Sequence, residues 1–260
     1  GHFAKRHITS NLTFATANIR ELKREFVFLN VATGEGTHTW RDENEDGIQD
    51  INEFYEAINP DEKTYIKLFT PTDEYINAYQ STYIHTLDVK MPEGWRDESG
   101  ILPVLSRVSF NTNLKYDFKT TSQDLMSRLD PFSVDLSDEK VVSARNLDRH
   151  TLFYNRNAPG FGLDVTRSGQ SSKSLLSGGF EIREKQDWLA AYRIGFGSVV
   201  TLRGRGGLGE TVNYSDFLES RNFSLGRKTI ESEVVWQPLN TFRLITGYGR
   251  RDKQRLEEGD

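Results

Sequence analysis

Ten residues decide the fold of this chain: Trp188-Leu189-Ala190-Ala191-Tyr192-Arg193-Ile194-Gly195-Phe196-Gly197. The even-numbered side chains from Trp188 to Phe196 are all apolar, whereas the odd-numbered positions include Arg193 and two glycines. Successive side chains of a strand point to opposite faces of a sheet. The alternation therefore predicts a β-strand with one apolar face and one polar or small face.

The same period-two pattern returns at residues 161–166, 230–237 and 242–249. Short turns can join antiparallel strands, whereas parallel strands need a crossover of a dozen or more residues, usually helical. No helical pattern separates these segments. We therefore expect consecutive antiparallel hairpins after residue 150.

Strand length and aromatic placement favour part of an outer-membrane β-barrel. A strand needs roughly 9–11 residues to cross a bilayer, and several segments reach that length. Trp188 and Trp236 lie near strand ends, where membrane barrels carry aromatic girdles. A soluble β-sandwich or extended meander shows the same alternation, so both architectures remain open at this point.

Three regions follow from the pattern, and all are mainly β. Residues 1–92 form a β-rich region, with strand-like segments at 26–31, 65–69 and 75–91. Residues 93–149 form a linker and irregular segment containing one strand, and Leu125, Met126 and Leu129 predict a short helix that Pro131 stops. Residues 150–260 form the antiparallel meander, which looks like part of a barrel.

A calcium-type loop stands out in the first region, at residues 42–53 with the sequence DENEDGIQDINE. It fits the pattern D-x-[DN]-x-[DN]-G-x₅-E. Calcium takes six to eight oxygen ligands, and the glycine permits the sharp turn of the loop. The expected Ca²⁺ ligands are the side chains of Asp42, Asn44, Asp46, Asp50 and Glu53 and the backbone carbonyl of Ile48.

The flanks of this loop favour a structural clip over a calcium switch. A sensor EF-hand needs a helix on each side, but the segment 26–31 upstream is strand-like and is followed by Gly34 and Gly36. In this the loop is similar to the thrombospondin-type-3 loops of secreted proteins. Extracellular sites of this kind bind weakly, with a dissociation constant of about 10⁻⁴ to 10⁻³ M. The alternative is an acidic, solvated turn.

Composition narrows the class of protein. The chain has 260 residues and no cysteine, so it has neither disulfides nor thiolate sites. It begins Gly-His-Phe, from which we expect a removed signal or a fragment. Residues 41–63 carry nine acidic and two basic side chains, which suits cation binding. Residues 160–252 carry ten acidic and thirteen basic ones, too mild a balance for nucleic acid.

Five stretches also carry a family resemblance: GEGTHTWRDENEDGIQDINEFYEA, YIKLFTPTDEYINAY, LFYNRNAPGFGLDVT, SKSLLSGGFEIRE and RNFSLGRKTIESEVVWQP. They resemble large, mostly uncharacterised surface or outer-membrane proteins of Bacteroidota that end in a β-barrel. The resemblance implies an exported protein with a barrel, and it brings no catalytic residue. The last six residues, 255–260, read as the middle of a hairpin, so we expect the barrel to extend beyond this chain.

No constellation of catalytic residues emerges. The run Gly204-Arg205-Gly206-Gly207-Leu208-Gly209 fits G-x-G-x-x-G, but a dinucleotide site needs a helix after it, and an inter-strand turn is the better interpretation. The five histidines are scattered, and His38 is expected to be a turn residue near the calcium-type loop. The acids Glu181, Glu184 and Asp187 are expected around a hairpin turn. Several arginines are expected to line a lumen, meet lipopolysaccharide phosphates or pair across strands with Glu231 and Glu233: Arg203, Arg205, Arg221, Arg227, Arg243 and Arg250.

Two functional hypotheses follow. The first is a non-enzymatic outer-membrane or cell-surface β-barrel component for transport, assembly or anchoring, with a structural calcium site in a soluble domain or plug. Its partners would be outer-membrane lipid and other envelope proteins, and no nucleic acid. The second is a soluble, secreted, calcium-stabilised β-sandwich, an adhesin or glycan-binding module with Trp95, Tyr79 and Tyr83 as a sugar platform.

Overall fold

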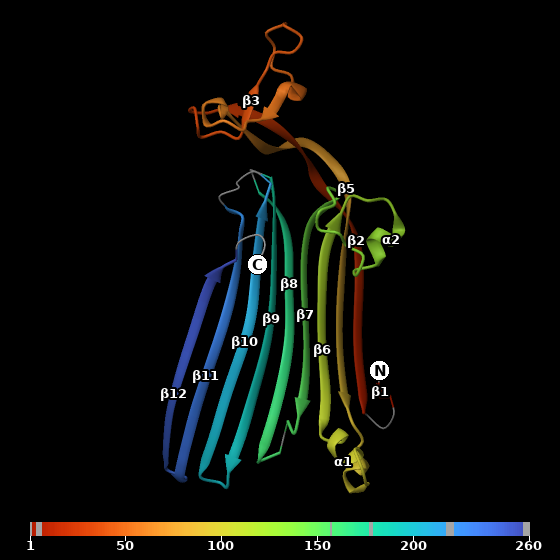
Figure 1. Cartoon of the computed structure of the whole chain (residues 1–260). Helices are drawn as coiled ribbons and strands as arrows, with labels where there is room; N and C mark the ends of the chain where they lie inside the picture. The colour runs from red at the N-terminus through yellow and green to blue at the C-terminus, as the bar shows by residue number, and fades with distance from the viewer. Residues whose placement is uncertain (1, 4–6, 157, 177–178, 217–220, 257–260) are drawn as a thin grey trace.

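The alternating segments form one antiparallel sheet in the computed structural model of the chain (Figure 1). The structure describes residues 2–3, 7–156, 158–176, 179–216 and 221–256. The sheet has twelve strands, so the mainly-β prediction is confirmed. Their bounds are β1 His2–Phe3, β2 Ile8–Asn30, β3 His38–Trp40, β4 Phe54–Glu56, β5 Tyr65–Lys90, β6 Val108–Thr120, β7 Val141–Tyr154, β8 Phe161–Leu176, β9 Gly179–Phe196, β10 Val200–Ser215, β11 Phe223–Leu239 and β12 Phe242–Arg255.

The strands lie side by side in chain order. The path runs β1-β2-β5 and then β6 to β12 without a crossover, while β3 pairs with β4 and β5 off this path. Every pairing is antiparallel, which confirms the expected consecutive hairpins after residue 150. Within the described residues β1 and β12 end the path without pairing to each other, so the sheet is open. The predicted hairpin at 255–260 lies largely outside the described residues.

The sheet is a single layer. Its accessible surface is 17509 Å², whereas a compact soluble chain of 29.8 kDa would expose about 11,600 Å². Among the described residues the buried apolar side chains are few, and most are small: Ala57, Ala78, Phe118, Val141, Ala144 and Val235. The described part of the chain thus lacks the second packed sheet that a β-sandwich requires.

Outside residues 31–64, short helices of the described chain lie in two connections. The 3₁₀ turn η3 (Glu93–Asp97) and α1 (Leu102–Leu105) join β5 to β6, and α2 (Leu125–Leu129) lies between β6 and β7. The α2 helix has the predicted bounds and ends before Pro131, a residue that cannot continue a helix. No helix in the described part of the chain is long and apolar enough to cross a membrane.

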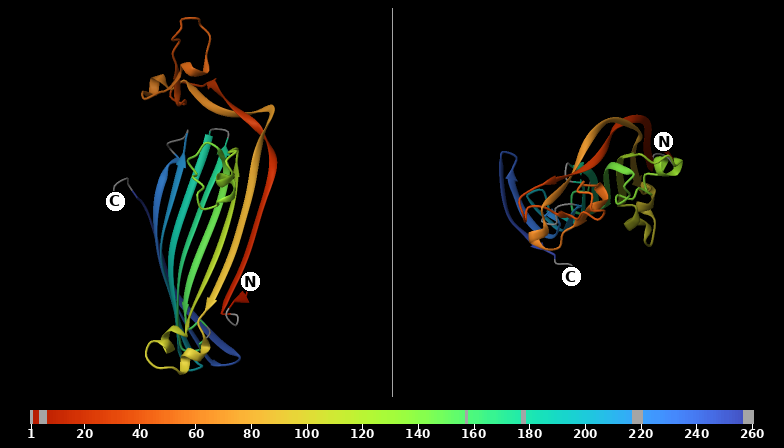
Figure 2. Two further views of the ribbon diagram at one scale, coloured as in Figure 1. Left: turned by 90° about the vertical axis from the view of Figure 1, so that its right-hand side faces the viewer. Right: turned by 90° about the horizontal axis from the view of Figure 1, so that it is seen from above.

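A two-stranded ribbon extends beyond the rest of the sheet (Figures 1 and 2). β2 and β5 pair as far as Asn30 and Tyr65, but β6 pairs with β5 only from Tyr79 to Lys90. The tip of the ribbon carries residues 31–64, here called the cap, which contains β3, η1 (Ile51–Glu53), β4 and η2 (Pro60–Glu62). One sheet therefore runs through the three predicted regions, whose boundaries as domains stay a prediction.

Two sequence-based interpretations were wrong. The glycine-rich run 204–209 lies inside β10 and is not an inter-strand turn. A Cβ at Gly204 would collide with the ring of Tyr192 on β9, so the run makes room for neighbouring side chains within the sheet. The acids Glu181, Glu184 and Asp187 likewise lie within β9 and do not surround a turn.

Candidate functional site

The strand registers assemble one continuous apolar surface from the even-numbered side chains of β9. Tyr192 lies opposite Leu163 of β8, Ile194 lies opposite Leu202 of β10, and Leu202 lies opposite Val234 of β11. We call this surface the apolar face. In β8–β11 it consists of Phe161, Leu163, Val165, Trp188, Ala190, Tyr192, Ile194, Phe196, Val200, Leu202, Leu208, Ile230, Val234 and Trp236.

The apolar face continues across the other half of the sheet. Val165 lies opposite Leu152, Leu152 opposite Phe110, and Phe110 opposite Val89. The same side of β2, β5, β6 and β7 then adds Ile8, Leu12, Phe14, Tyr83, Leu87, Leu114, Tyr116 and Tyr154. A row of apolar side chains thus crosses every long strand from β2 to β11.

Burial in the sheet is inverted relative to a protein that folds in water. Trp188 is 53% exposed and Ile230 is 66% exposed, yet the charged neighbours Glu231 and Glu233 on the other side of β11 are half-buried. In much of β9 and β11 the exposed positions alternate with the less exposed ones, and the exposed set is mainly the apolar-face one; β10 follows this pattern from Leu208 onward, whereas Arg203 and Arg205 on its polar face are exposed. Large apolar side chains are normally the most buried, so the exposure of this surface calls for an explanation.

The opposite side of β8–β11, here called the polar face, carries several cross-strand ion pairs. Arg205 pairs with Glu231, Arg227 pairs with Asp187, and Arg203 Nη1 lies 3.6 Å from Glu233 Oε1. The pairing of Arg203 and Arg205 with the two glutamates is the one that the sequence suggested. Arg250 lies on the apolar side and contacts Asp252 of its own strand.

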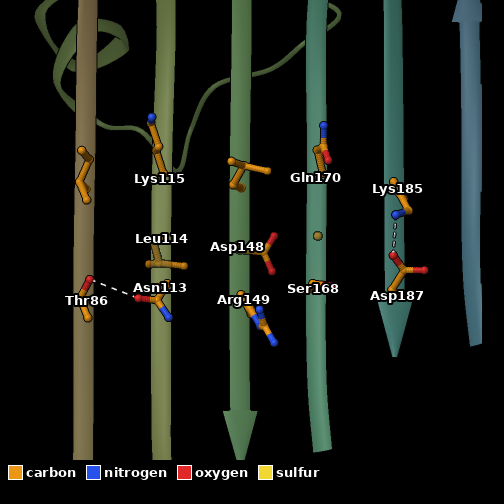
Figure 3. A pocket seen from close by; sticks show the side chains of 13 residues that line it. Thr86, Asn113, Leu114, Lys115, Asp148, Arg149, Ser168, Gln170, Lys185 and Asp187 are labelled. Atoms are coloured by element: carbon orange, nitrogen blue, oxygen red, sulfur yellow. Dashed lines mark hydrogen bonds and ion pairs between the residues drawn. The ribbon is translucent and has the colours of Figure 1, made fainter. Parts of the chain in front are cut away.

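A shallow groove of about 380 Å³ crosses the polar face of five strands, β5 to β9 (Figure 3). Polar and charged side chains line most of it, including Asn113, Lys115, Arg149 and Gln170. Lys185 Nζ lies 3.0 Å from Asp187 Oδ2 at one end. The lining combines charges of both signs with Ile84, Leu114 and Leu147.

The calcium-type loop lies in the cap, between β3 and η1. Its first three predicted ligands fold around one turn. Asp42 accepts hydrogen bonds from the N–H groups of Asp46 and Gly47, at 3.2 and 2.9 Å. Asn44 Oδ1 accepts from the N–H of Asp46 at 3.0 Å. Gly47 has a φ of +74°, a conformation that favours glycine.

Glu53 closes the loop from the other side and is 2% exposed. Its Oε2 accepts from the indole N–H of Trp40 at 3.0 Å and from the N–H of Asp50 at 3.4 Å. Its Oε1 accepts from the N–H of Glu43 at 3.3 Å. A buried carboxylate is held here by three N–H donors. The Trp40 contact was not foreseen, because it depends on the pairing of β3 with β4.

The loop therefore has the donor chemistry that calcium prefers, all oxygen, at the predicted positions. Asp42, Asn44 and Asp46 lie together, and Asp50 is the N-cap residue of η1. Ile48 donates its N–H to Asp46 Oδ1 at 2.7 Å. Within the described residues no group of three or more His, Cys, Asp or Glu side chains converges at metal-binding distance. Because the loop oxygens accept backbone N–H groups instead, calcium binding stays a prediction.

An aromatic cluster lies next to Glu53, the last residue of the calcium-type loop. Phe28 of the ribbon stacks on Phe54 with ring centroids 4.0 Å apart, and Phe54 meets Tyr65 edge-on at 5.0 Å. His38 packs on Phe28 at 5.1 Å and is buried in β3, so it is not the predicted turn residue. Burial lowers the pKa of His38 below its ordinary value.

Comparison with protein-family models, with curated proteins and with solved structures finds no match. The two faces of the sheet and the cap are therefore the features of this chain from which a function can be inferred.

Proposed function

We propose that this chain is a non-enzymatic β-sheet component of a bacterial outer membrane or cell surface. Its apolar face contacts lipid, and its polar face lines a hydrated interior. The observation that carries the proposal is the inverted burial in β9–β11. Membrane barrels alternate lipid-facing apolar and lumen-facing polar residues along each strand.

The dimensions of the apolar face support a membrane. From Trp188 to Phe196 the apolar positions of β9 cover about 26 Å along the strand at about 3.3 Å per residue. A strand tilt of about 40° reduces this to about 20 Å along the membrane normal, close to the roughly 25 Å apolar band of outer-membrane barrels. Trp188 at one end of this segment and Phe196 and Trp236 near the other match aromatic girdles.

We propose that the polar face lines an interior that contains ion pairs and water. Ion pairs across β9, β10 and β11 neutralise much of its charge without a buried catalytic group. Such a face suits transport, assembly or anchoring better than chemistry. Outer-membrane lipid is the main proposed partner, together with other envelope proteins.

The cap is proposed to be a structural unit stabilised by calcium. The ribbon holds it beyond the ends of the other strands rather than against the polar face (Figure 2). The donor set of residues 42–53 is all oxygen, and Glu53 is fixed by three N–H donors before any ion arrives. A preorganised ligand lowers the ordering cost of binding.

The test of the lipid-facing proposal uses two adjacent alanines. Ala190 lies on the apolar face and Ala191 on the polar face of β9. The chain has no cysteine, so Ala190→Cys and Ala191→Cys each give one labelling site. The chain is refolded in phospholipid vesicles, and each variant carries a nitroxide. We expect oxygen, which concentrates in lipid, to relax the label at 190, and a water-soluble nickel chelate to relax the label at 191.

Two outcomes would contradict this proposal. Equal accessibility of both labels to the nickel chelate would place both faces in water. A monodisperse, detergent-free chain with the label at 190 buried against protein would favour the secreted β-sandwich alternative.

A further inference from the structure

The connection between β6 and β7, residues 121–140, packs on the apolar side of the sheet. We call it the α2 lobe. Ser81 on β5 is fully buried and donates its hydroxyl hydrogen to the carbonyl of Arg128 at 2.7 Å. The Arg128 guanidinium lies 4.1 Å from the ring centroid of Tyr79. Ser81 lies opposite Phe118, in the same alternating row as Tyr83 and Tyr116.

Aromatic and aliphatic contacts fix the lobe in place. The Phe132 ring meets Tyr83 and Tyr116 edge-on, with centroids 5.5 and 5.4 Å apart. Val134 and Leu136 pack against the small core of Phe118, Val141 and Ala144. The lobe is thus a docked element at the upper end of the apolar face, where α2 lies in Figure 1.

Four large apolar side chains are exposed on the lobe among its polar and charged ones: Leu125, Met126, Leu129 and Phe132. Met126 is 66% exposed and Phe132 is 63% exposed, and Leu125 is exposed beside them. The helix is properly capped, because Asp124 accepts from the N–H of Ser127 at 2.8 Å. Phe132 keeps 63% of its surface exposed beside its contacts with Tyr83 and Tyr116, and through these two residues the exposed apolar side chains of the lobe adjoin the apolar face.

A matching element lies at the other end of β6. Beside α1, Ile101 and Val104 are exposed, and they precede β6 by a few residues. β6 has 13 residues, which span about 43 Å along the strand and about 33 Å along the normal at a tilt of about 40°. That separation is close to the hydrocarbon thickness of a bilayer, about 30 Å.

We propose that the α2 lobe and α1 are lipid anchors at the two interfaces of the membrane, with Leu125, Met126 and Phe132 inserted at the headgroup–acyl boundary. This inference rests on the proposed lipid-facing role of the sheet. The lobe carries five acidic and two basic side chains, so its insertion is driven by apolar contact. Anionic lipid should therefore not strengthen binding, unlike that of basic interfacial helices.

The experiment places a fluorophore on single cysteines of the full chain in phosphatidylcholine vesicles that contain lipids brominated at defined depths. The test site is Met126→Cys, and the matched lobe control is Ser133→Cys, an exposed polar position. Ala190→Cys reports the apolar face. We expect shallow bromines to quench the label at 126 about twofold more than the label at 133, and deep bromines to quench the label at 190.

The outcomes separate the two proposals. If lipid quenches the label at 190 but not at 126, or quenches 126 and 133 equally, the anchor inference is overturned while the lipid-facing sheet stands. If no site is quenched in vesicles that retain the chain, the proposed function fails as well. Quenching at 126 that persists with and without anionic lipid supports an apolar anchor.

Discussion

The cap and the sheet below it bury opposite kinds of side chain. Where the cap meets the ribbon, Phe54 of the cap packs on Phe28 and Tyr65 of the ribbon, and most loop carboxylates other than Glu53 are exposed. In β9 and β11, Trp188 and Ile230 are exposed while the ion-paired Asp187, Glu231 and Glu233 are half-buried. The two regions share one hairpin, β2–β5. One chain therefore contains a unit with an apolar interior and a sheet with an exposed apolar face, which we propose contacts lipid.

The largest effect should come from a charge on the apolar face. Ala190→Arg should cost about 2–4 kcal/mol of stability in vesicles if the site lies near the bilayer midplane. Ala191→Arg, on the polar face between Asp164 and Arg205, should cost less than about 1 kcal/mol. Urea unfolding of both variants in the same vesicles measures the difference. Equal costs would remove the contrast between the two faces.

A smaller effect is expected from Glu53 in the cap. Glu53→Ala leaves the indole N–H of Trp40 and two backbone N–H groups without their acceptor. This should cost about 1–3 kcal/mol and should abolish stabilisation by calcium. Asp46→Ala, at an exposed position, should mainly remove the calcium effect.

Thermal melting of the cap with and without Ca²⁺, followed by Trp40 fluorescence, measures both changes. Isothermal titration calorimetry provides the independent check. If calcium shifts neither the melting of the unmodified chain nor the calorimetric heat, the acidic-turn alternative holds.

The cap should also weaken on acidification. Burial lowers the pKa of His38 in the folded state, so the unfolded chain binds the proton more readily. Stability is then fully present above the unfolded pKa of about 6.5 and falls as the pH drops below it. Denaturant unfolding of the cap at pH 7.5 and at pH 5.5 tests the direction. His38→Phe should flatten the dependence, and an unchanged slope in this variant would assign the effect to another group.

The smallest effect concerns the ion pairs of the polar face. Arg205 and Glu231 are in contact across β10 and β11, but the arginine is largely exposed. A double-mutant cycle with Arg205→Gln and Glu231→Gln should give a coupling of about 0.2–1 kcal/mol. The coupling should shrink as salt is raised. A value above about 3 kcal/mol would indicate a far drier interior than we propose.

Sequence reasoning succeeded where the signal is local. The alternation from Trp188 to Phe196 predicts both faces of β9, because period two is a property of the strand itself. It failed where contacts between side chains of neighbouring strands determine which residue fits a position. The glycine-rich run 204–209 predicts a turn, yet it lies inside β10, where the ring of Tyr192 on the neighbouring strand β9 leaves no room for a Cβ at Gly204. No pattern within a single segment of the sequence predicts that contact.

The same division holds for the candidate sites. The spacing of Asp42, Asn44 and Asp46 predicts their shared turn, since side chains two residues apart cap the same loop. The bond from Trp40 to Glu53 depends on the packing of β3 and β4. The docking of Phe132 onto Tyr83 and Tyr116 joins residues from three elements, which periodicity within one segment does not reveal.

The alternation in the strands also has a consequence for how such a chain travels. Before the strands pair, apolar side chains are interspersed with polar and charged ones along the sequence, and the mean hydropathy is −0.61. The continuous apolar face forms only when the strands pair in registers such as Tyr192 opposite Leu163. If the sheet ends in lipid, as proposed, the unfolded polypeptide can cross a watery compartment in a soluble form. Its affinity for the bilayer is then acquired at the destination, in the act of folding.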